Sequence, residues 1–216
     1  IGAENAVAFD INAACSGFLF ALDTAALYLE HGGYQHALVI GAETLSKMMD
    51  WTDRSTCVLF GDGAGAAVLS ASKEDGILSM VQGSDGFRGD VLNCMARKVN
   101  NPYKKSDTAL SYVSMNGQEV YRFAVKTVPK AVTDAVEQAG LQLEEIDLFL
   151  LHQANYRIIE AVSKRLGQPM EKFPTNLEEC GNISAASVPI LLDNVNNHGM
   201  MRKGMKIVLA GFGAGL

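Results

Sequence analysis

Apolar and polar positions along the first part of the chain predict short strands and an amphipathic helix. An apolar run at residues 7–11 predicts a buried strand, and apolar side chains then recur at helical spacing until Gly32 and Gly33. The segment HALVIGAE, residues 36–43, predicts a second strand. Because a strand, a helix and a strand follow one another closely, the pattern predicts a βαβ unit and therefore a parallel sheet.

The second part of the chain has a similar pattern. We expect helices at 116–139, 154–166 and 185–199, a buried strand at 146–151, and a last strand that enters a glycine loop at 206–215. The segments 73–112 and 175–184 are polar and predict loops, most clearly at 99–108. VAFDINAACSGFLFAL and LFLLHQANYRIIEAV are both an apolar strand, a polar turn and a helix, which favours a duplicated α/β fold.

The glycine-rich segment GDGAGA, residues 61–66, has the composition of a nucleotide-binding loop. Such a loop requires a helix after it, whereas here the β-like run Ala66–Leu69 follows. We therefore interpret these glycines as positions of tight turns and close backbone packing.

Composition excludes several classes of protein. The 216 residues carry a net charge of −6, which disfavours nucleic-acid binding, and they contain no apolar stretch long enough to span a membrane. The four cysteines lie far apart without CxxC spacing, so we expect no metal site, no disulfide framework and a reducing, cytoplasmic location. The chain lacks a start methionine and stops directly after an expected strand, so we expect it to belong to a longer protein.

Three turns carry residues that could perform chemistry. Cys15 lies between a strand and a helix N-terminus, where free N–H groups and the helix dipole favour a thiolate. His152 follows a buried strand, and Asn182 lies in the turn CGNIS. A buried apolar cysteine, a core histidine and a turn asparagine are the structural alternatives, and each remains open for its residue taken alone. Together the three would supply a nucleophile and two hydrogen-bonding groups.

Five motifs in order resemble one family along essentially the whole chain. DINAACSGF, GDGAGAAVL, HQANYRII, GNISAASVP and GFGAG are similar to β-ketoacyl-acyl carrier protein synthase III, a condensing enzyme that starts fatty-acid synthesis. The resemblance implies the thiolase-like duplicated fold, five-layered α-β-α-β-α, from which the N-terminal third of a family member is absent. It divides the chain into residues 1–72, with the nucleophile, and residues 73–216, with the histidine and asparagine. It also implies a homodimer.

The resemblance implies a Cys-His-Asn triad at Cys15, His152 and Asn182. Cys15 would take an acyl group from acyl-CoA, and the two other residues would stabilise the enolate formed when malonyl-acyl carrier protein loses CO₂. The backbone N–H groups of Cys15 and of Gly213 and Ala214 would form the oxyanion hole, although the family usually has glycine at Ala214. No permanently bound cofactor is implied, because the coenzyme A thioester is a substrate.

The resemblance also assigns residues that bind the two substrates. Three positions match contacts to coenzyme A, of which Gln118 departs from the usual asparagine: Arg54, Gln118 and Asn155. Four basic positions match the family's docking surface for the acidic acyl carrier protein: Arg122, Arg157, Lys164 and Arg165.

Two other functions remain as alternatives. An acyltransferase of this fold would move an acyl group from Cys15 to an alcohol or amine without decarboxylation. A non-catalytic fragment or partner subunit would only support a dimer, although the intact Cys15, His152 and Asn182 argue against lost activity.

Overall fold

The computed structural model describes residues 2–74, 76–95, 99–106, 111–214 and 216. The helices are α1 (Gly17–Glu30), α2 (Gly117–Gln138), α3 (Tyr156–Leu166), α4 (Leu177–Cys180) and α5 (Ser187–Asn197). The strands are β1 (His36–Thr44), β2 (Asp62–Ser70), β3 (Leu92–Cys94), β4 (Val113–Met115), β5 (Leu148–Leu151) and β6 (Ile207–Ala210). Short 3-10 helices are η1 (Ala14–Ser16), η2 (Leu45–Met48), η3 (Gly86–Val91), η4 (Leu143–Glu145), η5 (Met170–Lys172) and η6 (Ser184–Ala186).

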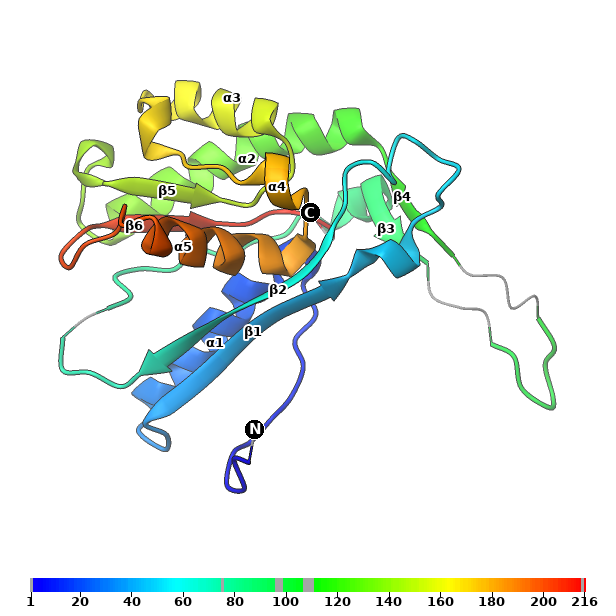
Figure 1. Ribbon diagram of the computed structural model, residues 1–216, viewed down its shortest axis with the longest axis horizontal. Coiled ribbons are helices and arrows are strands. Elements are labelled where there is room, and N and C mark those ends of the chain that lie inside the picture. Colours follow the sequence, from blue (N-terminus) through cyan, green and yellow to red (C-terminus); the bar gives the residue numbers. More distant parts are fainter. Residues whose placement is uncertain (1, 75, 96–98, 107–110, 215) are drawn as a thin grey trace.

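The parallel pair β5·β6 is buried on both faces. Because side chains alternate across a strand, Phe149 and Leu151 face the layer of α2 and α3, while Leu148 and Leu150 face α5. Figure 1 shows α2 and α3 on one side of this pair and α5 on the other. Burial on both faces explains why β5 is a continuous apolar run.

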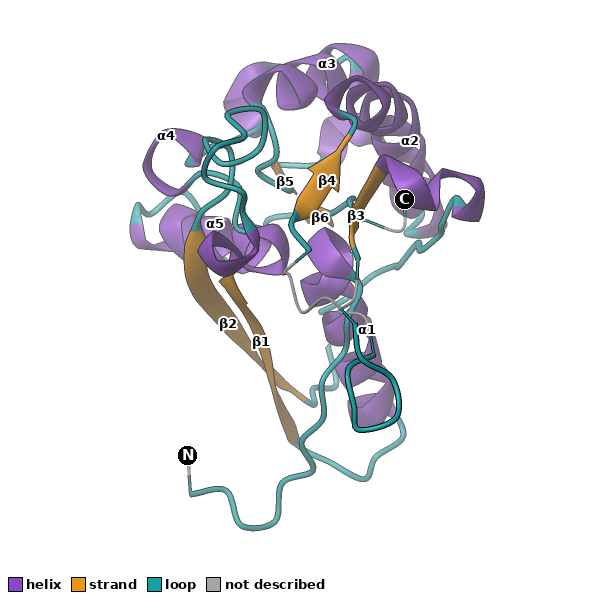
Figure 2. Cartoon of the chain, turned by 90° about the vertical axis from the view of Figure 1, so that its right-hand side faces the viewer, coloured by secondary structure: helices purple, strands orange, loops and turns teal. Residues whose placement is uncertain are grey.

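The helices α1 and α5 lie between β5·β6 and the hairpin β1·β2. Phe18 of α1, Val39 of β1 and Val188 of α5 form one buried cluster, and Leu209 of β6 packs against it. The described residues thus form alternating layers of helices, strands, helices and strands, with the long hairpin extending from one end (Figure 2). The outer face of the hairpin carries exposed apolar side chains, among them Leu38, Ile40 and Val68.

The glycines of the GDGAGA segment permit close packing, as predicted. β2 runs through the segment, and a Cβ atom added at Gly65 would lie 2.8 Å from the backbone nitrogen of Ile190. A Cβ atom added at Gly61 would lie 2.5 Å from the carbonyl oxygen of Cys180. The segment therefore brings α5 and the end of α4 against the chain at β2, which confirms the expected close packing. The tight turns also expected at these glycines are wrong, because residues 62–66 lie in β2.

The long predicted helices are confirmed, with ends set by recognisable caps. The side chain of Asn116 accepts the N–H of Glu119 at the start of α2, and Asn155 accepts the N–H of Arg157 at the start of α3. Gly167 ends α3 in the left-handed conformation, with φ of 66°.

The expected first strand is absent from the described residues. Residues 7–11 have no ladder partner there, and the side chains of Val7 and Phe9 are 61% and 55% exposed. The expected parallel βαβ unit is accordingly wrong, since β1 pairs with β2 in antiparallel orientation. A strand forms only where a neighbouring strand pairs with its backbone N–H and C=O groups. The apolar pattern of residues 7–11 does not show whether such a neighbour is present.

Other local expectations also need correction. The polar segment 175–184, expected to be a loop, contains the short helix α4. The polar segment 73–112, expected to be a loop, contains η3 and β3. The loop predicted at 99–108 is irregular as far as residue 106, and residues 107–108 lie outside the described residues.

Candidate active site

Cys15 lies at a sharp turn into α1. Ala14 has φ of 44°, an uncommon value for a residue with a side chain, and η1 continues directly into α1 at Gly17. The turn places Cys15 inside the molecule, where the residue is only 6% exposed. The sequence prediction of a cysteine at the start of a helix is confirmed.

The glycine loop after β6 lies against Cys15. A Cβ atom added at Gly213 would be 2.6 Å from the Cβ and 2.8 Å from the Sγ of Cys15, so only glycine fits there. The N–H of Ala214 hydrogen-bonds to the thiol. Ala214 does not have a positive φ, so the alanine is compatible with the backbone of this loop. Gly215, the last glycine of the GFGAG motif, lies outside the described residues.

Asn182 lies in a second turn, fixed by its backbone to the end of the segment before β2. Its N–H donates to Leu59 O at 2.9 Å, and its carbonyl accepts the N–H of Gly61 at 2.9 Å. Its side-chain Oδ1 accepts the N–H of Ser184 at 2.9 Å. Ser184 has φ of 46° and starts η6, so this turn resembles the one at Cys15.

His152 follows β5 and is 1% exposed. Its N–H donates to the carbonyl of Ala210 in β6 at 2.7 Å, which fixes the residue at the end of the sheet. The ring meets the ring of Phe212 edge-on, with centroids 5.4 Å apart. Among the described residues, its Nδ1 atom has no hydrogen-bond partner.

Burial sets the protonation states of Cys15 and His152. Burial, the largest cause, raises the pKa of the Cys15 thiol to about 11, and the negative charge of Glu43 raises it further, while hydrogen bonds from Ser184 and Ala214 lower it. Burial alone lowers the pKa of His152 to about 4. At neutral pH the resting site therefore holds a protonated thiol and a neutral imidazole. The helix N-terminus was expected to favour a thiolate, but burial outweighs this influence and keeps the thiol protonated.

The three candidate residues are connected through short segments. Ser184 hydrogen-bonds to the Cys15 thiol and, through its backbone, to Asn182. The segment 210–214 connects His152, through Ala210 and Phe212, to Gly213 beside Cys15. The buried centre can thus present one thiol, backbone N–H donors and two neutral side chains, which suits acyl transfer.

Sequence reasoning missed three residues of this centre. Ser184 hydrogen-bonds to the thiol, and Glu43 acts on it by charge. Gln153 is completely buried and joins β5 to the segment before α4, donating to Leu151 O at 2.7 Å and accepting the N–H of Asn176 at 3.2 Å. A signal for Glu43 was present, because it is a lone charge in the apolar segment HALVIGAE.

The expected substrate-binding residues are on the surface. Arg54 is exposed in the turn before β2, Gln118 is exposed in the first turn of α2, and Asn155 is the exposed cap of α3. The basic residues lie on α2 and α3, two helices that pack together. Arg157 and Arg165 are exposed on α3, while Lys164 pairs with Glu160 and Arg122 pairs with Glu119.

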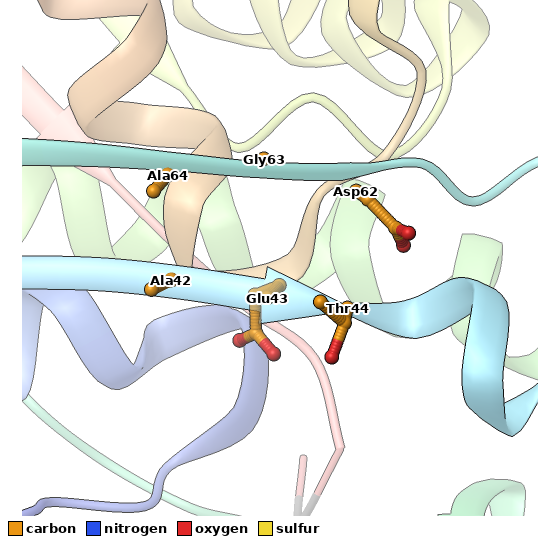
Figure 3. A pocket seen from close by; sticks show the side chains of 6 residues that line it. All are labelled: Ala42, Glu43, Thr44, Asp62, Gly63 and Ala64. Carbon is orange, nitrogen blue, oxygen red and sulfur yellow. The ribbon is translucent and has the colours of Figure 1, made fainter.

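A hollow of about 460 Å³ lies at one end of the hairpin, apart from the three candidate residues. Figure 3 shows Glu43 and Thr44 at the end of β1 and Asp62 extending from the start of β2. The hollow is lined by Ala42, Glu43, Thr44, Asp62, Gly63 and Ala64. Glu43 connects this hollow to the Cys15 environment, because its charge raises the pKa of the thiol.

In the ranges that the structure describes, no three histidine, cysteine, aspartate or glutamate side chains gather as metal ligands would. None of the helices within those ranges is long and apolar enough to cross a bilayer.

Comparison with known proteins by sequence and by structure finds synthases of the same kind. The family described as 3-oxoacyl-(acyl-carrier-protein) synthase III matches residues 9–86, and its C-terminal part matches residues 136–216. Beta-ketoacyl-(acyl-carrier-protein) synthase III of Clostridium acetobutylicum is 50% identical over 217 residues, which cover 100% of this chain and 67% of that protein.

Solved structures of the same kind superimpose closely. The 3-oxoacyl-(acyl-carrier-protein) synthase III of Aquifex aeolicus VF5 has a TM-score of 0.89 and 41% identity, covering 99% of this chain and 66% of its own. The priming beta-ketosynthase of the R1128 polyketide biosynthetic pathway has a TM-score of 0.92 and 40% identity, covering 100% of this chain and 64% of its own. This chain therefore spans about two thirds of the length of its relatives.

Proposed function

Because the chain belongs to the 3-oxoacyl-(acyl-carrier-protein) synthase III family of thiolase-fold acyltransferases, we propose that it carries the centre of a decarboxylative Claisen condensation. An acyl-CoA starter and malonyl-acyl carrier protein would give 3-oxoacyl-acyl carrier protein, the first condensation of fatty-acid synthesis. The observation that carries the proposal is the contact of Cys15 with Gly213, Ala214 and Ser184 in a buried turn.

The first half-reaction transfers the acyl group to Cys15. The sulfur attacks the thioester carbonyl, and the developing oxyanion accepts N–H groups of Cys15 and of the Gly213–Ala214 segment. Because the resting thiol is protonated, its proton must leave as the carbon–sulfur bond forms. It ends on the departing thiol of coenzyme A, so acyl-CoA and the Cys15 thiol become the acyl-enzyme and free coenzyme A.

The second half-reaction uses the acyl-enzyme. Malonyl-acyl carrier protein loses CO₂, and the electrons of the broken bond form an enolate whose oxygen accepts hydrogen bonds from His152 and Asn182. The enolate carbon then attacks the thioester, and the Cys15 sulfur leaves as a thiolate that takes a proton from water, which restores the thiol. A neutral imidazole serves here as a donor, which agrees with a His152 pKa of about 4.

The proposal includes the division into residues 1–72 and 73–216. It is supported by two similar turns, one with Ala14 at φ of 44° before α1 and one with Ser184 at φ of 46° before α5. These turns meet, since a Cβ atom added at Gly17 would lie 3.4 Å from the Cβ of Ala185.

It also includes the substrate contacts, the assembly and the compartment. Coenzyme A is bound as a substrate thioester by Arg54, Gln118 and Asn155, and no cofactor is held permanently. The protein forms a homodimer, which the exposed apolar face of β1·β2 supports. Its location is cytoplasmic, as favoured by four free cysteines.

We expect acetyl-CoA to label Cys15 alone. Cys15 is the buried cysteine that lies against the glycine loop, where backbone N–H groups can stabilise an oxyanion, whereas Cys180 ends the short helix α4. Intact mass and peptide mapping of the full-length protein, before and after malonyl-acyl carrier protein is added, measure both steps. An acyl group on Cys57 or Cys180 would contradict the assignment. An acyl-enzyme that malonyl-acyl carrier protein does not consume would favour the acyltransferase alternative. If no acyl-enzyme forms, the non-catalytic alternative is favoured.

Reversing the charges of Arg157 and Lys164 together is expected to weaken the use of malonyl-acyl carrier protein by about tenfold while sparing acetyl-CoA. Both side chains are exposed on α3, where they would attract an acidic carrier protein, and the step should slow with added salt. Steady-state rates at several salt concentrations measure this.

The matched control reverses Arg202 and Lys203, an exposed basic pair in the turn before β6. It makes the same change in net charge on a different element. Equal losses with both pairs, or equal losses with both substrates, would contradict docking on α3.

A further inference from the structure

Glu43 is a carboxylate on the inward face of β1. The other inward positions of this strand are Ala37, Val39 and Gly41, so Glu43 is the polar exception. Its side chain is partly buried, and Oε1 accepts the N–H of Ala185 at 3.3 Å. A charge on the inner face of a strand is costly unless it has such a partner.

The N–H group that Glu43 accepts belongs to the start of the η6–α5 helix. N–H groups in a first helical turn lack partners within the helix, and a negative charge there is favourable. Ala185 is also wedged between two elements, because Cβ atoms added at Gly17 and Gly41 would lie 3.4 Å from its Cβ and 2.8 Å from its carbonyl oxygen. Glu43 thus holds the turn at Ala185 by accepting its backbone N–H.

The turn held by Glu43 carries the groups that face the nucleophile. Asn182 and Ser184 are joined by a hydrogen bond of 2.9 Å, and both are at least nine-tenths buried. Ser184 has φ of 46°, which a side chain tolerates only where the surroundings hold it. Three polar groups from other elements act on the pKa of the Cys15 thiol: the Ser184 hydroxyl of η6 and the Ala214 N–H of the glycine loop lower it, and the Glu43 carboxylate of β1 raises it by its charge.

We propose that Glu43 is a positioning residue that fixes the Asn182–Ala186 turn against β1 and places a negative charge beside the nucleophile. The proposal rests on the proposed function, in which Cys15 is the nucleophile and Asn182 a donor. The hydrogen bond from Ala185 lets the carboxylate hold the turn that carries Asn182, and its negative charge adds to burial in disfavouring the thiolate of Cys15.

Two substitutions separate the two roles in the full-length protein. Glu43→Gln keeps an accepting oxygen but removes the charge, whereas Glu43→Ala removes both. Glu179→Gln is the matched control, because Glu179 is an exposed carboxylate of α4 that acts on Cys180. The readouts are the pH dependence of Cys15 alkylation by iodoacetamide, mapped by mass, and CO₂ release from malonyl-acyl carrier protein.

We expect Glu43→Gln to move the midpoint of Cys15 alkylation to lower pH by about 0.5, and to speed alkylation at pH 7.5 about threefold, because the thiolate is the reactive form. Its CO₂ release should stay within about twofold of the unchanged protein. Glu43→Ala should share the faster alkylation and lose about tenfold in CO₂ release, since the turn is no longer held. Glu179→Gln should change neither quantity.

If Cys15 is alkylated in Glu43→Gln at the same rate and with the same pH midpoint as in Glu179→Gln, the charge effect is overturned. Undiminished CO₂ release in Glu43→Ala would overturn the positioning effect. If Glu43→Ala does not fold, Glu43→Asp replaces it, with normal alkylation and slower CO₂ release expected. Alkylation needs no substrate, so a wild-type protein that acetyl-CoA does not label would contradict the proposed function while the alkylation profiles still decide the role of Glu43.

Discussion

Replacing Asn182 by alanine is expected to leave acyl transfer to Cys15 largely intact while lowering CO₂ release from malonyl-acyl carrier protein by about 10²-fold or more. His152→Ala should have the same effect on CO₂ release. The difference between the two half-reactions follows from which donors each one uses. In the proposed mechanism acyl transfer relies on backbone N–H groups, whereas decarboxylation places charge on an oxygen that accepts hydrogen bonds from His152 and Asn182.

The hydrogen bonds of Asn182 determine which of its atoms can act. Its Oδ1 accepts the N–H of Ser184 at 2.9 Å, so its Nδ2 hydrogens are the part available to a substrate oxygen. Alanine removes this donor but leaves the backbone hydrogen bonds to Leu59 and Gly61, which hold the turn. His152 is neutral above a pH of about 4, so its contribution should not fall as pH drops from 8 to 6. Because it can also assist removal of the thiol proton, His152→Ala should slow acylation somewhat more than Asn182→Ala.

CO₂ release from labelled malonyl-acyl carrier protein and mass-detected acylation are measured on the same preparations. Asn197→Ala is the matched control, since Asn197 is an exposed asparagine at the end of α5, bonded to Asp193. An Asn182→Ala protein that decarboxylates as fast as this control would reduce Asn182 to a turn residue. The acyltransferase alternative would then be the better explanation.

Helices and packing glycines of this fold could be predicted from the sequence because their causes are local. Asn116, Asn155 and Gly167 each mark a helix end through their own hydrogen bonds or backbone angle. The pairing partners of the strands could not be predicted from the sequence, because pairing joins residues far apart in the chain. β1 pairs with β2, whereas the apolar residues 7–11 have no partner among the described residues.

The features of the candidate site also differ in whether the sequence could predict them. The turn at Cys15 and the place of His152 after a buried strand follow from local pattern. The protonated state of the thiol does not, because it results from burial by α1, η6 and the glycine loop together. Ser184 and Glu43 were missed for this reason. They lie 169 and 28 positions from Cys15 in the chain, yet both act on the pKa of its thiol.

Gly213→Ala is expected to lower the rate of Cys15 acylation by about 10²-fold. The added Cβ would lie 2.6 Å from the Cβ and 2.8 Å from the Sγ of Cys15, closer than non-bonded carbon and sulfur atoms approach. Either the thiol or the glycine loop must move. Both movements separate the sulfur from the N–H donors that stabilise the oxyanion, so acyl transfer should suffer before global stability does.

Gly211→Ala in the same loop is the control for this substitution. Its added Cβ would lie 3.2 Å from the Leu19 side chain and 3.3 Å from Cys15 O, contacts that small adjustments relieve. Burst acylation by acetyl-CoA, followed by intact mass, should therefore remain within about threefold for Gly211→Ala. Thermal unfolding of both variants separates a local from a global effect. If Gly213→Ala acylates as fast as Gly211→Ala with an unchanged melting temperature, the glycine loop does not form the oxyanion hole, and the donors that face the Cys15 thioester must come from elsewhere in the protein.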